Sequence, residues 1–221
     1  MIKEVPLRVD FAGGWLDVPA HSRVGGFIVN CAIQPLVSLE NWPFRVGSGL
    51  GGSAAWSILS NKDPYHFDAM NGCGWQDPAI ILETGLCVWK SGLSPKLHCK
   101  NTGEILNGKM ALYDTQIPHN NKQVSKKQRD YQQIYRASQI AAHAVENNDY
   151  LELARAVNLS YAAQLDEGMS KLPPVRGTIA YKYCGGGHGG YALYLFRTQF
   201  ERDFVIKGNP KFQPIEPYCK D

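Results

Sequence analysis

Two glycine-rich segments constrain this chain more than any other feature of its sequence. Residues 47–52 read GSGLGG and residues 185–190 read GGGHGG, and both fit the pattern G-x-G-x-x-G. Glycine lets the backbone turn sharply and approach a ligand without a Cβ atom in the way. The sequence after the first segment predicts a short helix with Ser53 as its N-cap, whereas YALYLF after the second predicts a strand.

The elements that follow the two segments decide what the segments can bind. A dinucleotide-binding turn needs a helix after its glycines, so the strand after the second segment excludes that interpretation. No Lys-Ser or Lys-Thr pair follows either segment, which excludes a Walker P-loop. The first segment leads into a helix, whose unpaired amides and positive dipole end suit a phosphate group. A tight turn that serves packing alone is the alternative, but two such segments in one chain favour phosphate binding.

Hydrophobic patterning along the chain predicts an α+β fold. Strands are expected at 5–11, at 27–39, in three short runs between 87 and 114, and on both sides of the second glycine segment. Apolar residues at helical spacing predict helices from about 126 to 166, with a break at 147–149. Glycines and prolines predict that 61–78 is largely loop and that the proline-containing tail is an extended edge. Strands followed by helices and then strands indicate an α+β domain.

Charge, hydropathy and cysteine content exclude several classes of protein. Lys and Arg total 23 against 20 Asp and Glu, and this net charge of +3 is too small to predict nucleic-acid binding. No apolar run is long enough to span a membrane, and the first residues lack the apolar region of a signal peptide. The six cysteines form no CxxC pair and no zinc spacing, so we expect buried thiols in a cytoplasmic protein.

Four segments together resemble the motifs of the GHMP-type small-molecule kinases, and most closely the branch that phosphorylates fucose and heptose phosphates. They occur in the family's order and read PLRVDFAGGWLDVPAHSRVGGFIVNCAI (6–33), GSGLGGSAAW (47–56), GCGWQDPA (72–79) and KYCGGGHGGYALYLF (182–196). The resemblance implies a truncated, GHMP kinase-like α+β fold. Its N-terminal half, residues 1–110, would be like ribosomal S5 domain 2, and its C-terminal half, residues 111–221, would be ferredoxin-like.

The resemblance also implies a reaction, namely ATP-dependent phosphorylation of a sugar or sugar phosphate at its anomeric hydroxyl, with ATP and Mg²⁺ as cofactors. Asp77 would orient or deprotonate the acceptor hydroxyl, and Arg8 would stabilise charge on the transferring phosphoryl group, since this chemistry depends on positioning and electrostatics. The Ser53 hydroxyl would bind phosphate or Mg²⁺. The residues implied to hold the triphosphate are Gly47, Ser48, Gly49, Leu50, Gly51, Gly52 and Ser53. The residues implied to bind the sugar are Asp17, Gly14, Trp15, Gly187, His188 and Gly189.

Most of these residues also have a plain structural explanation. Arg8 alone would be a surface residue of a strand, and Asp17 and Asp77, each close before a proline, would cap or begin turns. Within the motifs we prefer the functional interpretation. His188 stands where the family usually has glycine, and it either contacts substrate or is tolerated in a turn. His119 is expected to be a loop residue.

The chain departs from the family pattern between its motifs, where its connections are unusually short. No glutamate occurs between Glu40 and Glu83, the region where the family places a Mg²⁺ ligand, so Asp63 and Asp68 are candidates to replace it. The alternative function is therefore a catalytically degenerate protein that binds a sugar or sugar phosphate without phosphoryl transfer. The expected partner is a small molecule, neither nucleic acid nor membrane, and homodimer formation stays open.

Overall fold

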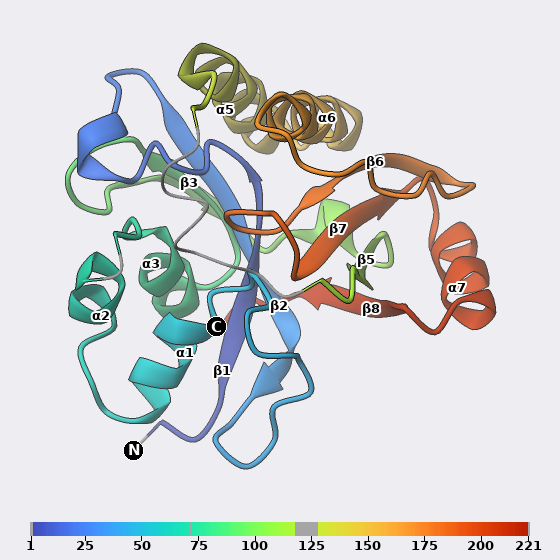
Figure 1. Ribbon diagram of the computed structural model, residues 1–221, viewed down its shortest axis with the longest axis horizontal. Helices are drawn as coiled ribbons and strands as arrows, with labels where there is room; N and C mark the ends of the chain where they lie inside the picture. Colours follow the sequence, from blue (N-terminus) through green and yellow to red (C-terminus); the bar gives the residue numbers. More distant parts are fainter. Residues whose placement is uncertain (1, 71, 118–127, 221) are drawn as a thin grey trace.

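Antiparallel pairing joins the strands of the described residues into one sheet, which helices flank (Figure 1). The computed structural model describes residues 2–70, 72–117 and 128–220. The strands are β1 (Val5–Ala12), β2 (Phe27–Val37), β3 (Leu86–Lys90), β4 (Leu97–Asn101), β5 (Met110–Asp114), β6 (Thr178–Tyr183), β7 (Tyr191–Phe196) and β8 (Phe212–Pro217). The helices are α1 (Gly52–Leu59), α2 (Pro64–Met70), α3 (Gln76–Glu83), α5 (Tyr131–Glu146), α6 (Tyr150–Asp166) and α7 (Gln199–Gly208), with short 3-10 turns at Pro19–His21 and Glu104–Leu106.

The last strand, β8, lies in the middle of the sheet and joins its two halves. The strand order is β4-β3-β2-β8-β5-β7-β6, with β1 paired to β2. Ile33 of β2 pairs with Pro217, and Ala111 of β5 pairs with Pro214. The prediction of an extended edge for the tail is therefore wrong in two respects, because the tail contains α7 and its strand is internal. A capping box between Thr198 and Glu201 starts the helix. The division of the chain at residue 110 stays a prediction.

Strand β1 carries two different faces although all of its residues are buried. Side chains alternate across a strand, so Leu7, Val9 and Phe11 point into the main hydrophobic core. Arg8 and Asp10 occupy the opposite face and line the main cavity of the molecule. A single strand therefore supplies both core packing and two charged groups to one site.

Helices α5 and α6 pack against each other and against β1, β2 and β6 (Figure 1). Their apolar spacing and the break between them confirm the prediction for this region. Asp130 caps α5 by accepting hydrogen bonds from two backbone amides, and Asp149 caps α6 through the amide of Glu152. The predicted start of the helix at residue 126 lies outside the described residues.

The prediction of a loop for 61–78 is wrong, because this region contains α2 and the start of α3. The prolines in this region are the reason for that prediction. Proline lacks an amide hydrogen, but the first turn of a helix tolerates it because the amides there have no intrahelical acceptor. Pro64 is the first residue of α2, and Pro78 lies in the first turn of α3. Asp63 caps α2 through the amides of the residues that follow it.

The short strands predicted between 87 and 114 correspond to β3, β4 and β5. None of the helices in the described residues is both long and apolar enough to cross a membrane.

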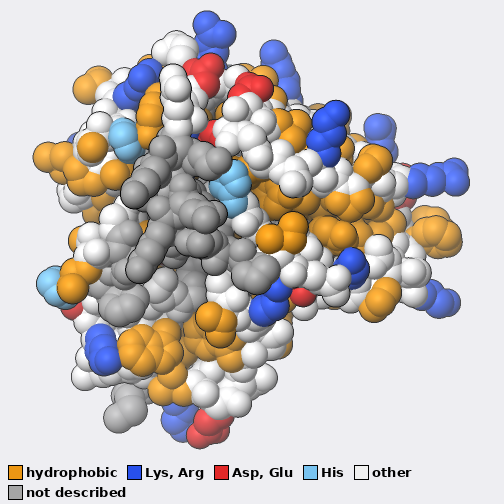
Figure 2. Space-filling model, in the orientation of Figure 1, with side chains coloured by type: hydrophobic (Ala, Val, Ile, Leu, Met, Phe, Trp, Pro, Cys, Tyr) orange, Lys and Arg blue, Asp and Glu red, His pale blue; other side chains and the backbone are white. Residues whose placement is uncertain are grey.

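On the right of Figure 2, where α7 lies in Figure 1, hydrophobic side chains reach the surface, and Phe200 and Phe204 of α7 are exposed. The prediction of buried thiols holds for Cys31, Cys87 and Cys184, whereas Cys99 and Cys219 are half-buried and Cys73 is exposed and lines the main cavity.

Candidate active site

A cavity of about 610 Å³ lies between β1, α1, α3 and the two glycine segments. This volume falls within the range of roughly 300–1,000 Å³ that is usual for small-molecule sites. The predicted site residues that line it are Arg8, Gly14, Trp15, Asp17, Gly47, Ser48, Gly49, Gly51, Gly52, Ser53 and Asp77. The structure therefore gathers the first three motifs around one space.

The first glycine segment ends at the N-terminus of α1, which faces this cavity. The helix begins at Gly52 with Gly51 as its N-cap, so the prediction of Ser53 as N-cap is wrong. Gly51 adopts a left-handed conformation with φ 77°, and a Cβ atom there would lie 3.4 Å from Asp77 Oδ2. No side chain caps the helix, and Ala55 donates the first intrahelical bond to Gly51. The backbone amides of Gly52, Ser53 and Ala54, in the first turn of α1, precede this first intrahelical bond and can therefore bind an anion.

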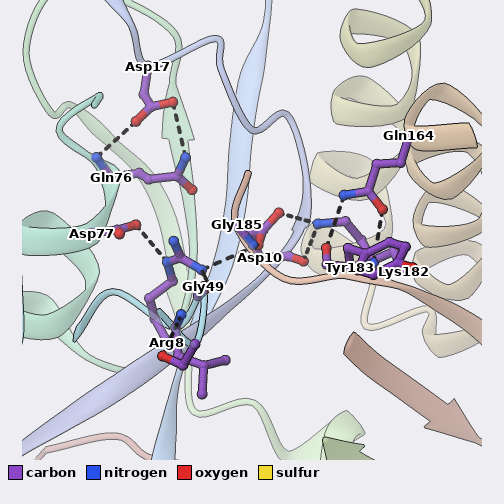
Figure 3. Close-up of polar contacts among 12 residues, drawn as sticks. Arg8, Asp10, Asp17, Gly49, Gln76, Asp77, Gln164, Lys182, Tyr183 and Gly185 are labelled. Carbon is purple, nitrogen blue, oxygen red and sulfur yellow. Dashed lines mark hydrogen bonds and ion pairs between the residues drawn. The ribbon is translucent and has the colours of Figure 1, made fainter. Parts of the chain in front are cut away.

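Asp77 and Arg8 form an ion pair beside this helix terminus. Arg8 Nε donates to Asp77 Oδ1 at 2.6 Å, and Arg8 Nη1 donates to the carbonyl of Gly49 at 2.7 Å (Figure 3). Burial opposes the charge on Arg8, but the carboxylates of Asp77 and Asp10 outweigh burial and raise the pKa of Arg8 above its usual range. The guanidinium is therefore charged, and it joins the glycine segment to the acidic residue.

Asp17 lies on the same cavity wall, held by the start of α3. The backbone amide and the side-chain amide of Gln76 each donate to one Asp17 oxygen, both at 3.1 Å (Figure 3). A Cβ atom at Gly74 would lie 1.8 Å from Asp17 Oδ2, so the glycine makes room for this carboxylate. Burial raises the pKa of Asp17 to about 6, although the Gln76 amide favours its charged form.

We expect this shift to make folding stability depend on pH. The folded pKa of Asp17 lies above the ordinary value of 3.8, so the folded state binds the proton more tightly than the unfolded state. The resulting stabilisation is complete below about pH 4 and is lost as the pH rises through 6, a change of about 3 kcal/mol. The measurement is urea unfolding of the wild type and of Asp17→Asn between pH 3.5 and 7.5. A stability difference between the two that is independent of pH contradicts the assignment.

The second glycine segment supports the first instead of lining the cavity along its length. Gly185 and Gly186 line the cavity, whereas the described lining residues do not include Gly187, His188 or Gly189. A Cβ atom at Gly187 would lie 2.3 Å from the sulfur of Met169, so this part of the turn packs against the residues after α6.

Close backbone contact between the two segments explains why both are rich in glycine. A Cβ atom at Gly49 would lie 2.6 Å from the carbonyl of Cys184, and one at Gly190 would lie 2.6 Å from the carbonyl of Ser48. Tyr191 also donates its amide to Ser48 O at 2.9 Å. Leu50 is fully buried in the main core, so it contributes to this loop through its backbone.

Sequence reasoning missed several residues that the structure brings to the cavity. Asp10 lies two residues after Arg8 in β1, and strand alternation could have placed both on one face. Gln76 precedes Asp77 in the motif GCGWQDPA (72–79), but nothing in the sequence indicated that it donates hydrogen bonds to Asp17. Trp42 and Trp56 also line the cavity, and neither was predicted as a site residue although Trp56 ends the second motif and lies in α1.

The residues around the cavity fit ATP more completely than they fit a metal ion. The helix terminus and the glycine backbone suit a triphosphate. No group of three or more His, Cys, Asp or Glu side chains that could hold a metal occurs among the described residues. Mg²⁺ commonly binds through substrate phosphates, water and one or two protein ligands, and the exposed Ser53 fits such a role. Asp63 caps α2 and is not among the lining residues, and both His119 and the Asp68 side chain lie outside the described part of the chain.

Comparison with known proteins supports the fold. No protein-family model matches the sequence, and no curated protein matches it. The mevalonate kinase of Methanococcus jannaschii aligns with a TM-score of 0.70 and 13% identity, over 99% of this chain and 98% of that chain. Lactococcus lactis galactokinase, complexed with galactose, gives 0.62 and 12%, over 98% and 92%. Streptococcus pneumoniae phosphomevalonate kinase, in complex with phosphomevalonate and AMPPNP, gives 0.61 and 10%, over 98% and 99%.

These neighbours define the class of fold. The chain has the fold of the GHMP-type small-molecule kinases, and the predicted α+β, GHMP kinase-like architecture is confirmed. The likeness to the fucose and heptose phosphate branch stays a prediction, because the neighbours described above act on other acceptors.

Proposed function

We propose that this protein is an ATP-dependent small-molecule kinase that transfers the γ-phosphoryl group to a hydroxyl. One observation carries the proposal: Asp77 and the N-terminus of α1 face one cavity, with Arg8 bonded to the acidic residue and to the glycine loop. A helix terminus suits a polyphosphate, and a carboxylate suits an acceptor hydroxyl. The phosphomevalonate kinase neighbour is in complex with AMPPNP, and this supports ATP as the donor.

Each residue then has a defined part in the reaction. Arg8 holds Asp77 Oδ1, which leaves Oδ2, on the side of Gly51, to accept the proton of the acceptor hydroxyl. The charged guanidinium also stabilises the phosphoryl group as negative charge builds on its oxygens. Mg²⁺, held by phosphate oxygens and the Ser53 hydroxyl, would offset further phosphate charge. The apolar rings of Trp42 and Trp56 offer a surface for the nucleotide base.

The acceptor is proposed to be a fucose-like sugar or a heptose phosphate, phosphorylated at the anomeric position. This part rests on the resemblance in the motifs, and Asp17 with Trp15 in the cavity wall suits a polyhydroxylated ring. A cytoplasmic location is also part of the proposal, and it is supported by cysteines that form no CxxC pair and no zinc spacing. A homodimer stays a prediction, and none of the residue roles above is assigned to a second chain.

A coupled assay of ADP release tests the proposal. The panel comprises hexoses, deoxyhexoses and heptose phosphates, with mevalonate and phosphomevalonate as acceptors taken from the structural neighbours, all with Mg·ATP. We expect turnover with at least one sugar and a rise in melting temperature with Mg·ATP alone. Sugars that raise the melting temperature when Mg·ATP does not, without ADP release, would instead favour the degenerate sugar-binding protein. Turnover with mevalonate alone would retain the kinase and reject the sugar.

A further inference from the structure

Asp10, which lines the cavity, forms a buried ion pair with Lys182. Lys182 Nζ contacts Asp10 Oδ2 and donates to the Asp10 carbonyl at 2.9 Å (Figure 3). Both side chains are almost fully buried, with exposures of 3% for Lys182 and 4% for Asp10. The pair joins β1 to β6, two strands that are far apart in the sequence and are not hydrogen-bonded neighbours in the sheet.

The other oxygen of Asp10 contacts the site itself. Asp10 Oδ1 accepts from the amide of Gly185 at 2.8 Å and from Arg8 Nη1 at 3.4 Å. Gly185 lines the cavity, and its backbone packs closely against Gly49. The closeness is such that a Cβ atom at Gly185 would lie only 2.9 Å from the Gly49 carbonyl oxygen. One carboxylate therefore contacts the arginine and the second glycine segment at once.

Helix α6 holds the backbone of Tyr183, the residue that follows Lys182 in β6. The Gln164 side chain accepts from the Tyr183 amide at 2.9 Å and donates to the Tyr183 carbonyl at 3.0 Å (Figure 3). These two hydrogen bonds attach the last residue of β6 to α6. Burial opposes the charge on Asp10, but Lys182 and Arg8 outweigh burial and lower the pKa of Asp10. The Asp10 carboxylate is thus charged and is held by Lys182, Arg8 and the Gly185 amide.

We propose that Asp10, anchored by Lys182, is a positioning residue that fixes the Arg8 guanidinium and the Gly185 amide in the geometry that phosphoryl transfer needs. The inference rests on the proposed function. The Arg8 guanidinium donates hydrogen bonds to Asp77 and to the Gly49 carbonyl, and Asp10 is a third acceptor for the same planar group. A guanidinium held from three sides keeps its orientation as charge develops on the phosphate, which is how a supporting residue contributes to rate.

Paired substitutions separate positioning from stability. In Lys182→Met, Asp10 loses its buried partner, so the melting temperature should fall by on the order of 10 °C. The double variant Asp10→Leu/Lys182→Met removes both charges and replaces the ion pair with two apolar side chains, so part of this loss should be recovered. Its kcat should nevertheless stay about 10- to 100-fold below wild type, with a smaller change in KM for ATP, because Arg8 and Gly185 lack their acceptor. Asp10→Asn keeps an acceptor and should be intermediate.

A matched control and a direct probe of Arg8 complete the test. Glu216→Gln weakens a different ion pair, with Arg202, whose residues do not line the cavity, so kcat should be unchanged. In ¹⁵N NMR spectra the Arg8 Nε–H signal, assigned with Arg8→Lys, should shift in the double variant. A wild-type kcat with an unmoved Arg8 signal in that variant overturns the proposal. Absence of turnover in the wild-type protein would reject the proposed function, and the Arg8 signal would then decide this inference on its own.

Discussion

Asp77→Asn should lower kcat by about 10²- to 10⁴-fold while leaving ATP and sugar affinities within a few-fold of wild type. The amide matches the carboxylate in shape and can still accept the 2.6 Å hydrogen bond from Arg8 Nε, so the fold and the cavity should persist. It cannot take a proton from an acceptor hydroxyl. The measurement is steady-state ADP release at saturating substrates, together with dissociation constants from calorimetry.

Asp203→Asn is the matched control for this substitution. Asp203 also pairs with an arginine Nε, at 2.9 Å, but it lies in α7 and does not line the cavity. Its kcat should equal that of the wild type. If Asp77→Asn retains full turnover, the carboxylate has no part in the reaction, and the kinase proposal must find another group to accept the proton.

The motifs allowed the positions of several candidate-site residues to be predicted from the sequence. Asp77 and Gly51 are 26 positions apart in the chain, yet the motifs predicted that they meet, and the structure places Asp77 Oδ2 beside Gly51. Strand alternation and helical spacing also predicted most elements, because β1 and the α5–α6 pair follow their periods clearly.

Tertiary contacts determined the features that the sequence did not reveal. Gln76 supports Asp17, and Lys182 supports Asp10, through contacts between residues separated by 59 and 172 positions, which no local pattern encodes. The helix in the tail was missed because prolines near residues 210–217 outweighed the capping box at Thr198. Glycines at 187 and 189 looked like ligand contacts, but their segment is shaped by packing against Met169 and the first glycine loop.

Arg8→Met should have the largest effect on the proposed reaction, with kcat falling by about 10³- to 10⁵-fold, the range of arginines that stabilise phosphoryl transfer. Methionine follows the arginine side chain only as far as Nε, so the guanidinium is removed, and with it the charge beside Asp77 and the hydrogen bond to Gly49. Since the arginine acts mainly on charge that develops during transfer, the ATP dissociation constant should change much less than kcat.

Arg8→Lys distinguishes the geometry of the guanidinium from its charge. A lysine keeps the positive charge, but its single ammonium group lacks the planar fork that reaches both Asp77 Oδ1 and the Gly49 carbonyl. Its kcat should therefore lie between those of Arg8→Met and the wild type. Because Arg8 is only 4% exposed, each variant needs a melting curve, and rates should be compared below the onset of unfolding. If Arg8→Met weakens ATP binding as much as it lowers kcat/KM, with kcat unchanged, Arg8 binds the ground state and does not stabilise the transition state.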